Sequence, residues 1–254
     1  MKAIIESQTP ILQDSSVKKA LSSFINQPDS YKSKFLQSAY NVGFDGYSYI
    51  GQKDSLNQYD TDLLHSFVIS DFVSVDKYPK EFHQFLATEW QVLTTAIKTI
   101  ELELAEQLNL PGLIQLYQED KVGYMMSCNF YPDPKRLQAE AETNVRLSSH
   151  KDASIFTTFP FGIDKGLAYT TNENNIQNVG VVNQHMFSFK GYFIEYFSNH
   201  QQQALQHQVD LPENPSSERF SFAVFSLPKP KSTFYHNGKL ISGATYFNDY
   251  LSLF

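Results

Sequence analysis

Between residues 78 and 108 the hydrophobic residues recur at intervals of three and four positions, which is the spacing of one face of an α-helix. The series runs from Phe82 to Leu108, after Tyr78-Pro79 and before Asn109-Leu-Pro111-Gly112. Proline at the beginning and a Pro-Gly pair at the end are typical of helix boundaries. We predict one long helix here, with an apolar face that packs on a sheet.

From residue 122 onward the pattern changes to short segments rich in β-branched and aromatic residues, separated by turn-forming residues. Such segments predict strands, and their spacing favours a sandwich or jelly roll. We expect the strands at residues 122–130, 146–159, 166–169, 179–189, 204–209 and 220–225. Outside this region we expect a strand at 3–5, helices at 15–26, 193–199 and 246–254, and an ordered loop with short extended pieces at 40–75.

Two predicted strands carry residues that could bind a metal ion. His150 and Asp152 are two positions apart, so on a strand both point to the same side. His207 lies in another predicted strand, where Leu205 and Val209 share its parity, so we expect it to point inward. Two imidazoles and one carboxylate hold one face of an octahedral iron ion in non-haem Fe(II) oxygenases. We therefore predict that His150, Asp152 and His207 bind iron.

Two further pairs have the same spacing of one intervening residue. Arg219 and Ser221 place a guanidinium beside a hydroxyl, which suits a carboxylate because the planar guanidinium can bind it with two parallel hydrogen bonds. Asn129 and Tyr131 form the other pair. We expect all three pairs to project into the lumen of a small barrel.

In this order and spacing, these residues resemble the non-haem iron, 2-oxoglutarate-dependent oxygenases of the isopenicillin N synthase-like group. The matching pieces are His150-x-Asp152, His207 after 54 intervening residues, Arg219-x-Ser221 and Asn129-Phe-Tyr131-Pro. A single His-x-Asp occurs often by chance, whereas the ordered set is specific. The resemblance implies a mostly β fold with flanking helices: a double-stranded β-helix, or cupin-like jelly-roll, core backed by a long helix.

The resemblance also implies the activity. Fe(II) would be held by the His-Asp-His set, and the co-substrate 2-oxoglutarate by Arg219 and Ser221 with Tyr131 and Asn129, while O2 is the oxidant. The reaction would oxidise an unactivated C–H bond of a small molecule by hydroxylation, desaturation or cyclisation, in specialised metabolism.

Two alternatives remain open. A same-fold Fe(II) oxidase uses no 2-oxoglutarate, and Arg219 and Ser221 would then bind the substrate's own carboxylate; Tyr131 favours the co-substrate. A non-catalytic binding module would keep the fold without the chemistry. Among the other histidines, His200 is the rival third ligand, but Ser-Asn-His-Gln predicts a turn that would hold its side chain poorly.

Composition sets wider limits. The 254 residues, 41% of them hydrophobic, predict one large domain. The resemblance implies that this is a single oxygenase domain over 1–254, with a helical and loop part at 1–120, the jelly-roll core at 121–228 and a tail helix at 229–254. A net charge of −7 argues against a nucleic-acid partner. The single cysteine, Cys128, excludes an intrachain disulfide and indicates a reducing compartment.

The N-terminal sequence and the lengths of the apolar segments lead to further expectations. The sequence has no run of about 18 apolar residues, and its first residues lack the apolar core of a signal peptide. We therefore expect no membrane association, a cytoplasmic location and a monomer. The family's usual first strand and helix, with their Gly-Phe-Phe and Asn-His-Gly signature, are missing, so we expect the chain to begin after them and the sheet edge to be covered differently.

Overall fold

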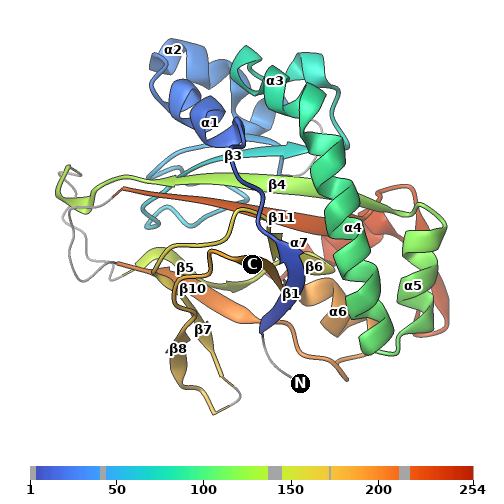
Figure 1. Ribbon diagram of the computed structural model, residues 1–254. Helices are drawn as coiled ribbons and strands as arrows, with labels where there is room; N and C mark the ends of the chain where they lie inside the picture. The colour runs from blue at the N-terminus through green and yellow to red at the C-terminus, as the bar shows by residue number, and fades with distance from the viewer. Residues whose placement is uncertain (1–3, 41–43, 137–144, 172, 212–217, 254) are drawn as a thin grey trace.

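Two antiparallel sheets face each other in the computed structural model, which describes residues 4–40, 44–136, 145–171, 173–211 and 218–253 (Figure 1). The major sheet has the order β1-β9-β6-β11-β4-β3-β2, and the minor sheet the order β5-β10-β7-β8. The major-sheet strands are β1 (Ile4–Pro10), β9 (His185–Lys190), β6 (Phe156–Phe159), β11 (Arg219–Pro228), β4 (Val122–Tyr131), β3 (His65–Ser70) and β2 (Gly46–Ser48). Those of the minor sheet are β5 (Val145–Lys151), β10 (Gln206–Asp210), β7 (Leu167–Thr170) and β8 (Ile176–Asn178).

This arrangement is the predicted jelly-roll core, so the predicted fold class is confirmed. The expectation of a small barrel with a lumen was wrong in one respect. Within the described residues no strand pairing joins the two sheets into a closed barrel, and the space lies between two separate sheets. The third sheet is a small hairpin of β12 (Thr233–His236) and β13 (Lys239–Ser242).

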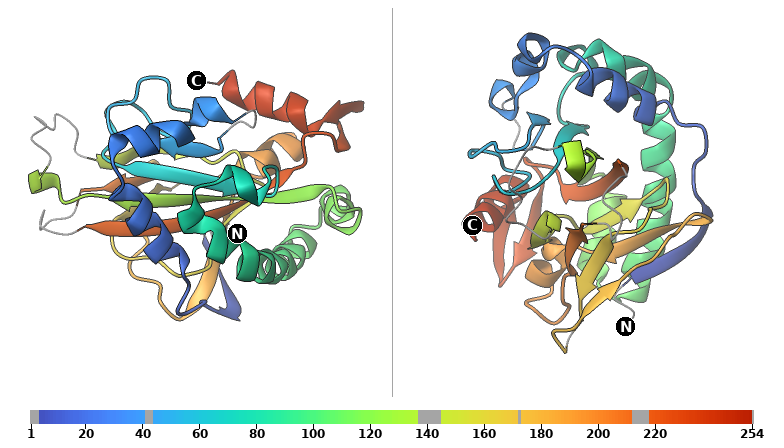
Figure 2. Two further views of the ribbon diagram at one scale, coloured as in Figure 1. Left: turned by 90° about the horizontal axis from the view of Figure 1, so that it is seen from above. Right: turned by 90° about the vertical axis from the view of Figure 1, so that its left-hand side faces the viewer.

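Helices cover the outer face of the major sheet. The longest, α4, runs along this face in Figure 1 and in both views of Figure 2. Its apolar stripe, which includes Leu93, Ile97 and Leu104, is buried against the sheet, as the sequence pattern predicted.

The α-helices are α1 (Val17–Ile25), α2 (Asp29–Lys32), α3 (Lys80–Thr88), α4 (Trp90–Gln107), α5 (Pro111–Gln118), α6 (Tyr192–Phe197) and α7 (Gly243–Leu251). The short 3-10 helices are η1 (Ser33–Phe35), η2 (Gln37–Ala39), η3 (Val75–Lys77) and η4 (Pro134–Arg136).

The single helix predicted over residues 78–108 is in fact two. The backbone bends at Glu89, whose φ is −115°, and α3 ends there. The Glu89 carboxylate accepts a hydrogen bond from the backbone N–H of Ser16, at the beginning of α1 (3.0 Å). Trp90 donates its indole N–H to Asp71 at 2.7 Å. Both partners are distant in the sequence, so the apolar spacing alone could not indicate the break.

The predicted strand over 146–159 also divides. Residues 145–151 form β5 of the minor sheet, and residues 156–159 form β6 of the major sheet, so the chain passes between the sheets at 152–155. The segment 179–189 is strand only from His185, and the sequence patterns did not predict α5, β8 or the β12–β13 hairpin. At the N-terminal end, β1 pairs with β9 and forms one edge of the major sheet.

None of the helices in the described part of the chain combines the length and apolar character that a membrane span requires.

Candidate functional site

The longest ladder of the major sheet forms the floor of the site. β4 and β11 pair over ten residues, and Arg219 lies opposite Tyr131 while Ser221 lies opposite Asn129. The two pairs found in the sequence are therefore cross-strand neighbours on the same face. Every second residue of both strands lines one cavity, so this face is continuous from Arg219 at one end to Leu227 at the other.

The wall opposite is formed by the ends of two minor-sheet strands. His150 and His207 are direct cross-strand partners of β5 and β10, and their ring centres are 4.4 Å apart. Asp152 is one residue past the end of β5, where the chain leaves for the major sheet. Its Oδ1 lies 3.2 Å from Nε2 of His150, and its Oδ2 lies 3.7 Å from Nε2 of His207. The structure thus brings the three predicted ligands together, with ligand atoms within 4.8 Å of one another.

Hydrogen bonds orient the two imidazole rings. Nδ1 of His150 lies 2.7 Å from the carbonyl of Ser148, and Nδ1 of His207 lies 3.3 Å from the carbonyl of Leu205. A carbonyl only accepts, so Nδ1 of each ring carries a proton, and Nε2 of each ring faces the Asp152 carboxylate.

The charges of the cluster follow from burial and from the neighbours. Burial would raise the pKa of Asp152, but the charge of His207 and the hydrogen bond from His150 outweigh it and hold this pKa below its usual value. Burial lowers the pKa of His207 to about 4. Burial also acts against the charged form of His150, but the hydrogen bond and charge of Asp152 outweigh it and raise the pKa of His150. A carboxylate and a neutral imidazole are the forms that bind metal ions.

Arg219 marks the other end of the cavity. Its side chain is buried, and its guanidinium carbon is 4.9 Å from the centre of the Tyr131 ring. The Nε and Nη1 groups of Arg219 are buried without a hydrogen-bond partner among the described residues. An unpaired donor in such a place costs free energy, so these groups are suited to an anionic ligand with two oxygens.

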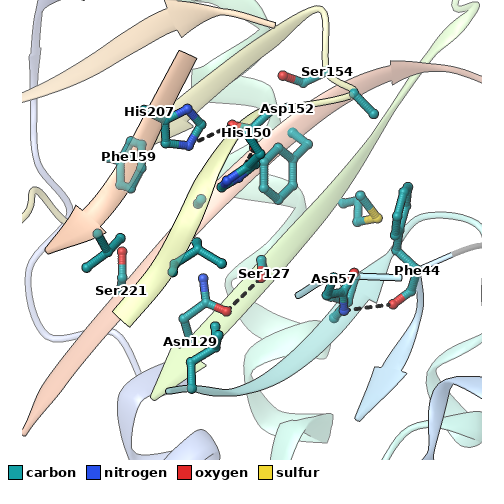
Figure 3. A pocket seen from close by; sticks show the side chains of 18 of the residues that line it. Phe44, Asn57, Ser127, Asn129, His150, Asp152, Ser154, Phe159, His207 and Ser221 are labelled. Carbon is teal, nitrogen blue, oxygen red and sulfur yellow. Dashed lines mark hydrogen bonds and ion pairs between the residues drawn. The ribbon is translucent and has the colours of Figure 1, made fainter. Parts of the chain in front are cut away.

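One cavity contains all of these groups. Figure 3 shows the imidazoles and Asp152 on one side and Asn129 and Ser221 on the other. The amide oxygen of Asn129 accepts a hydrogen bond from Ser127 at 2.9 Å, so its amide nitrogen points away from Ser127. All seven residues predicted from the sequence line this cavity: His150, Asp152, His207, Arg219, Ser221, Asn129 and Tyr131.

The core of the chain matches a known family model. Residues 122–228 fit the model described as the 2OG-Fe(II) oxygenase superfamily. This part of the chain is a 2OG-Fe(II) oxygenase domain. A search of curated proteins found no match.

Solved structures show the same fold. A full-length Neurospora crassa protein, solved in complex with alpha-KG and thymine, superposes with a TM-score of 0.72 at 16% identity, over 98% of this chain and 86% of that one. JOX2 in complex with 2OG, Fe and JA superposes with a TM-score of 0.69 at 19% identity, over 92% of this chain and 72% of that one. The dioxygenase for auxin oxidation of rice superposes with a TM-score of 0.67 at 16% identity, over 94% of this chain and 80% of that one.

The donor set of the oxygenase domain fits the metal of its family. Two imidazole nitrogens and a carboxylate are the ligands that non-haem Fe(II) sites use, and all three side chains converge without a fourth protein ligand among the described residues. The unpaired guanidinium groups of Arg219 likewise fit the distal carboxylate of 2-oxoglutarate.

His200, the rival ligand, lies outside the cluster. Its side chain is 65% exposed, and its Nδ1 is 3.3 Å from the carboxylate of Glu195. The same carboxylate accepts hydrogen bonds from Lys151 at 2.8 Å and from the backbone N–H of Ala204 at 3.0 Å. Lys151 therefore points away from the cavity, although both of its neighbours in the sequence line it.

Several residues of the cavity were not found from the sequence. Phe44, Asn57, Met125, Leu227 and Tyr250 come from the N-terminal loops, the two floor strands and α7. Met125 and Leu227 share the parity of the predicted residues on β4 and β11, so extending the period of two along those strands would have indicated them. The other three belong to segments with no periodic pattern.

Proposed function

We propose that this chain is an Fe(II)- and 2-oxoglutarate-dependent oxygenase that oxidises an unactivated C–H bond of a small molecule in specialised metabolism. One observation supports it above the others: the His-Asp-His cluster lines the same cavity as Arg219, whose Nε and Nη1 groups have no hydrogen-bond partner among the described residues. This arrangement supports a co-substrate that binds the metal at one end and Arg219 at the other.

In this proposal His150, Asp152 and His207 hold Fe(II). Arg219 and Ser221 bind the distal carboxylate of 2-oxoglutarate, and their cross-strand neighbours Tyr131 and Asn129 complete this end of the site. When bound, the metal and co-substrate supply activation of O2 coupled to decarboxylation of 2-oxoglutarate to succinate.

The remaining residues of the cavity position the substrate and exclude water. Phe44, Val68, Met125 and Leu227 form apolar walls on the side of the cavity away from Arg219. A C–H bond can be oxidised selectively only if it is held near the metal, and apolar walls exclude water that would divert the oxidant. Hydroxylation, desaturation and cyclisation all begin with that positioning.

The nearest alternative is an Fe(II) oxidase without 2-oxoglutarate, in which Arg219 holds the substrate. An anaerobic Fe(II) titration of the purified protein, with and without 2-oxoglutarate, separates the two. Our proposal expects the weak visible charge-transfer band of the iron chelate only when 2-oxoglutarate is present, and its loss in Arg219→Ala. Substrate turnover without 2-oxoglutarate would support the oxidase. A non-catalytic module would bind no Fe(II) in the same titration.

The wider context stays a prediction. We propose a monomeric, cytoplasmic enzyme with a single domain over 1–254 that acts on a small molecule and not on nucleic acid. The single cysteine, Cys128, and the net charge of −7 support these points.

A further inference from the structure

We propose that the substrate is uncharged and largely apolar, and that it binds between the metal cluster and the end of the cavity formed by Phe44, Met125 and Leu227. This inference rests on the proposed function, because it assigns Arg219 to 2-oxoglutarate. Its basis is the distribution of charge along the cavity.

The charged groups are confined to one part of the cavity. Among the described residues that line it, Arg219 is the only lysine or arginine, and Asp152 is the only carboxylate. Asp152 faces the two imidazoles. Arg219 lies eight residues along β11 from Leu227, which is roughly 27 Å of extended strand. Once 2-oxoglutarate engages Arg219, the described residues that line the cavity include no further lysine or arginine to pair with a substrate carboxylate, and an unpaired buried carboxylate is strongly disfavoured.

The opposite end offers only neutral groups. Apolar side chains form most of it, and its polar side chains already have partners. Asn57 donates to the carbonyl of Phe44 at 3.5 Å, and Ser154 shares a hydrogen bond with Thr157 at 2.7 Å. Figure 3 shows Asn57 beside Phe44 on the side of the cavity away from Ser221. A few neutral polar groups among apolar walls are typical of sites that orient an uncharged ligand.

The described residues at the entrance likewise include no lysine or arginine, and their one carboxylate is that of Asp62. A second hollow shares Leu56, Asn57, Leu147, His150 and Tyr250 with the cavity and leads outward from it. At its edge Leu56 is 47% exposed, as is the adjacent Tyr59. Apolar side chains at a cavity mouth favour entry of an apolar molecule, and the net charge of −7 disfavours the approach of anions.

A nearby group of lysines does not alter this assignment. Lys98, Lys229 and Lys231 line a neighbouring hollow, and Phe44, Met125 and Leu227 line both spaces and so form the wall between them. Lys229 is also paired with Asp120 at 2.7 Å.

The test uses the full chain, loaded anaerobically with Fe(II) and saturating 2-oxoglutarate. The probes are two matched pairs, phenylacetamide with phenylacetate and 1-naphthaleneacetamide with 1-naphthaleneacetate, and their dissociation constants are measured by calorimetry. We expect each amide to bind at least about tenfold more tightly than its acid, because the acid buries a charge without a partner.

A charge introduced at the entrance should reduce this preference for the amides. Leu56→Arg places a cation at the mouth, and we expect it to tighten binding of the acids severalfold. The matched control is Leu240→Arg, which adds the same charge at another exposed leucine, on β13, and should change nothing.

Acids that bind as tightly as the amides in the parent protein, or amides that do not bind at all, would overturn the inference. Equal tightening by Leu56→Arg and Leu240→Arg would overturn the placement at Leu56, since net charge would then explain it. Failure of the proposed function looks different: the charge-transfer band with 2-oxoglutarate would be absent before any probe is added.

Discussion

Two buried carboxyl groups lie on opposite faces of β6 and have opposite properties. Asp152 accepts a hydrogen bond from Thr157 on the cavity side at 2.6 Å, and Glu101 of α4 lies 3.5 Å from the hydroxyl of Thr158 on the helix side. The imidazoles beside Asp152 hold its pKa below the usual value. Among the described residues, the hydrogen-bond partners of Glu101 are hydroxyl groups, such as that of Tyr117 at 3.0 Å, and burial raises the pKa of Glu101 to about 8.

The difference shows that the partner, and not burial alone, sets the charge of a buried carboxyl. Asp152 stays ionised because potential cations surround it, and an ionised carboxylate can bind a metal. Glu101 keeps its proton near neutral pH and connects α4 to the sheet through hydroxyl groups. Because side chains alternate along β6, one face of this strand lies toward the cavity and the metal cluster, and the other lies toward α4. The predictions that follow test this separation.

The largest effect is expected where the metal ligands are removed. Asp152→Asn and His207→Ala should each abolish iron-dependent turnover, because each removes a proposed ligand. Iron content after anaerobic loading and oxygen consumption measure the loss, and circular dichroism checks that the fold is retained. Glu101→Gln is the matched control on the other face of β6 and should bind iron as the parent does. Full activity in Asp152→Asn would exclude its role as a ligand.

Glu101→Gln should instead change how stability depends on pH. The unfolded chain releases this proton near pH 4.5 and the folded chain near 8, so the stabilisation is complete below 4.5 and is lost as the pH rises through 8. At about 1.4 kcal/mol per pH unit, the loss is at most about 5 kcal/mol. The glutamine variant should lack this dependence. Its free energy of unfolding, compared with that of the parent at the same pH, should therefore be more favourable at pH 9 than at pH 5.

Urea unfolding of the parent and of Glu101→Gln at a series of pH values measures this difference. Parallel curves for the two proteins would show that Glu101 is ionised in the folded state, and the contrast with Asp152 would then disappear.

A smaller effect is expected at the far end of the cavity. Arg219→Ala should weaken 2-oxoglutarate binding about ten- to hundredfold, since the loss of a charge-assisted hydrogen bond costs about 1.5–3 kcal/mol. Arg219→Lys should recover only part of this affinity, because an ammonium group keeps the charge without the planar pair of donors. Titration of the charge-transfer band gives the affinity. Unchanged 2-oxoglutarate affinity with intact Fe(II) binding in Arg219→Ala would contradict the assignment.

The smallest effect is expected at His200. Its exposed ring lies 3.3 Å from Glu195, which Lys151 and Ala204 also engage, so His200→Ala should leave iron content and turnover within about twofold of the parent. Loss of iron in this variant would show that the third ligand is His200 and not His207.

Much of the site could be predicted from the sequence because its residues occur in pairs two positions apart. A period of two places both members of a pair on one face of a strand whatever the strand pairs with. That rule found Arg219 with Ser221 and Asn129 with Tyr131, which then proved to be cross-strand partners. For Asp152 the prediction of convergence was right although the residue lies just beyond its strand.

The rest depended on contacts between distant segments. The break at Glu89 coincides with the hydrogen bond that its carboxylate accepts from Ser16, and residues 146–159 divide because β5 pairs within the minor sheet and β6 within the major sheet. The pKa of Glu101 depends on Tyr117 and on residues of β6. None of these partners can be read from local periodicity, because a hydrogen bond or a strand register is a relation between positions that only folding brings together.

The sequence by itself therefore determined which side chains of the candidate site share a strand face, the jelly-roll class and the apolar face of α4, since each follows from a local period and from side-chain type. Only the tertiary structure decided that Arg219 is left with unpaired donors, that Lys151 turns to Glu195, and that one end of the cavity has no charge to offer. Whether a polar or charged group has a partner depends on which residues surround it in the folded chain. Those neighbours come from distant parts of the sequence, so only the complete tertiary structure reveals them.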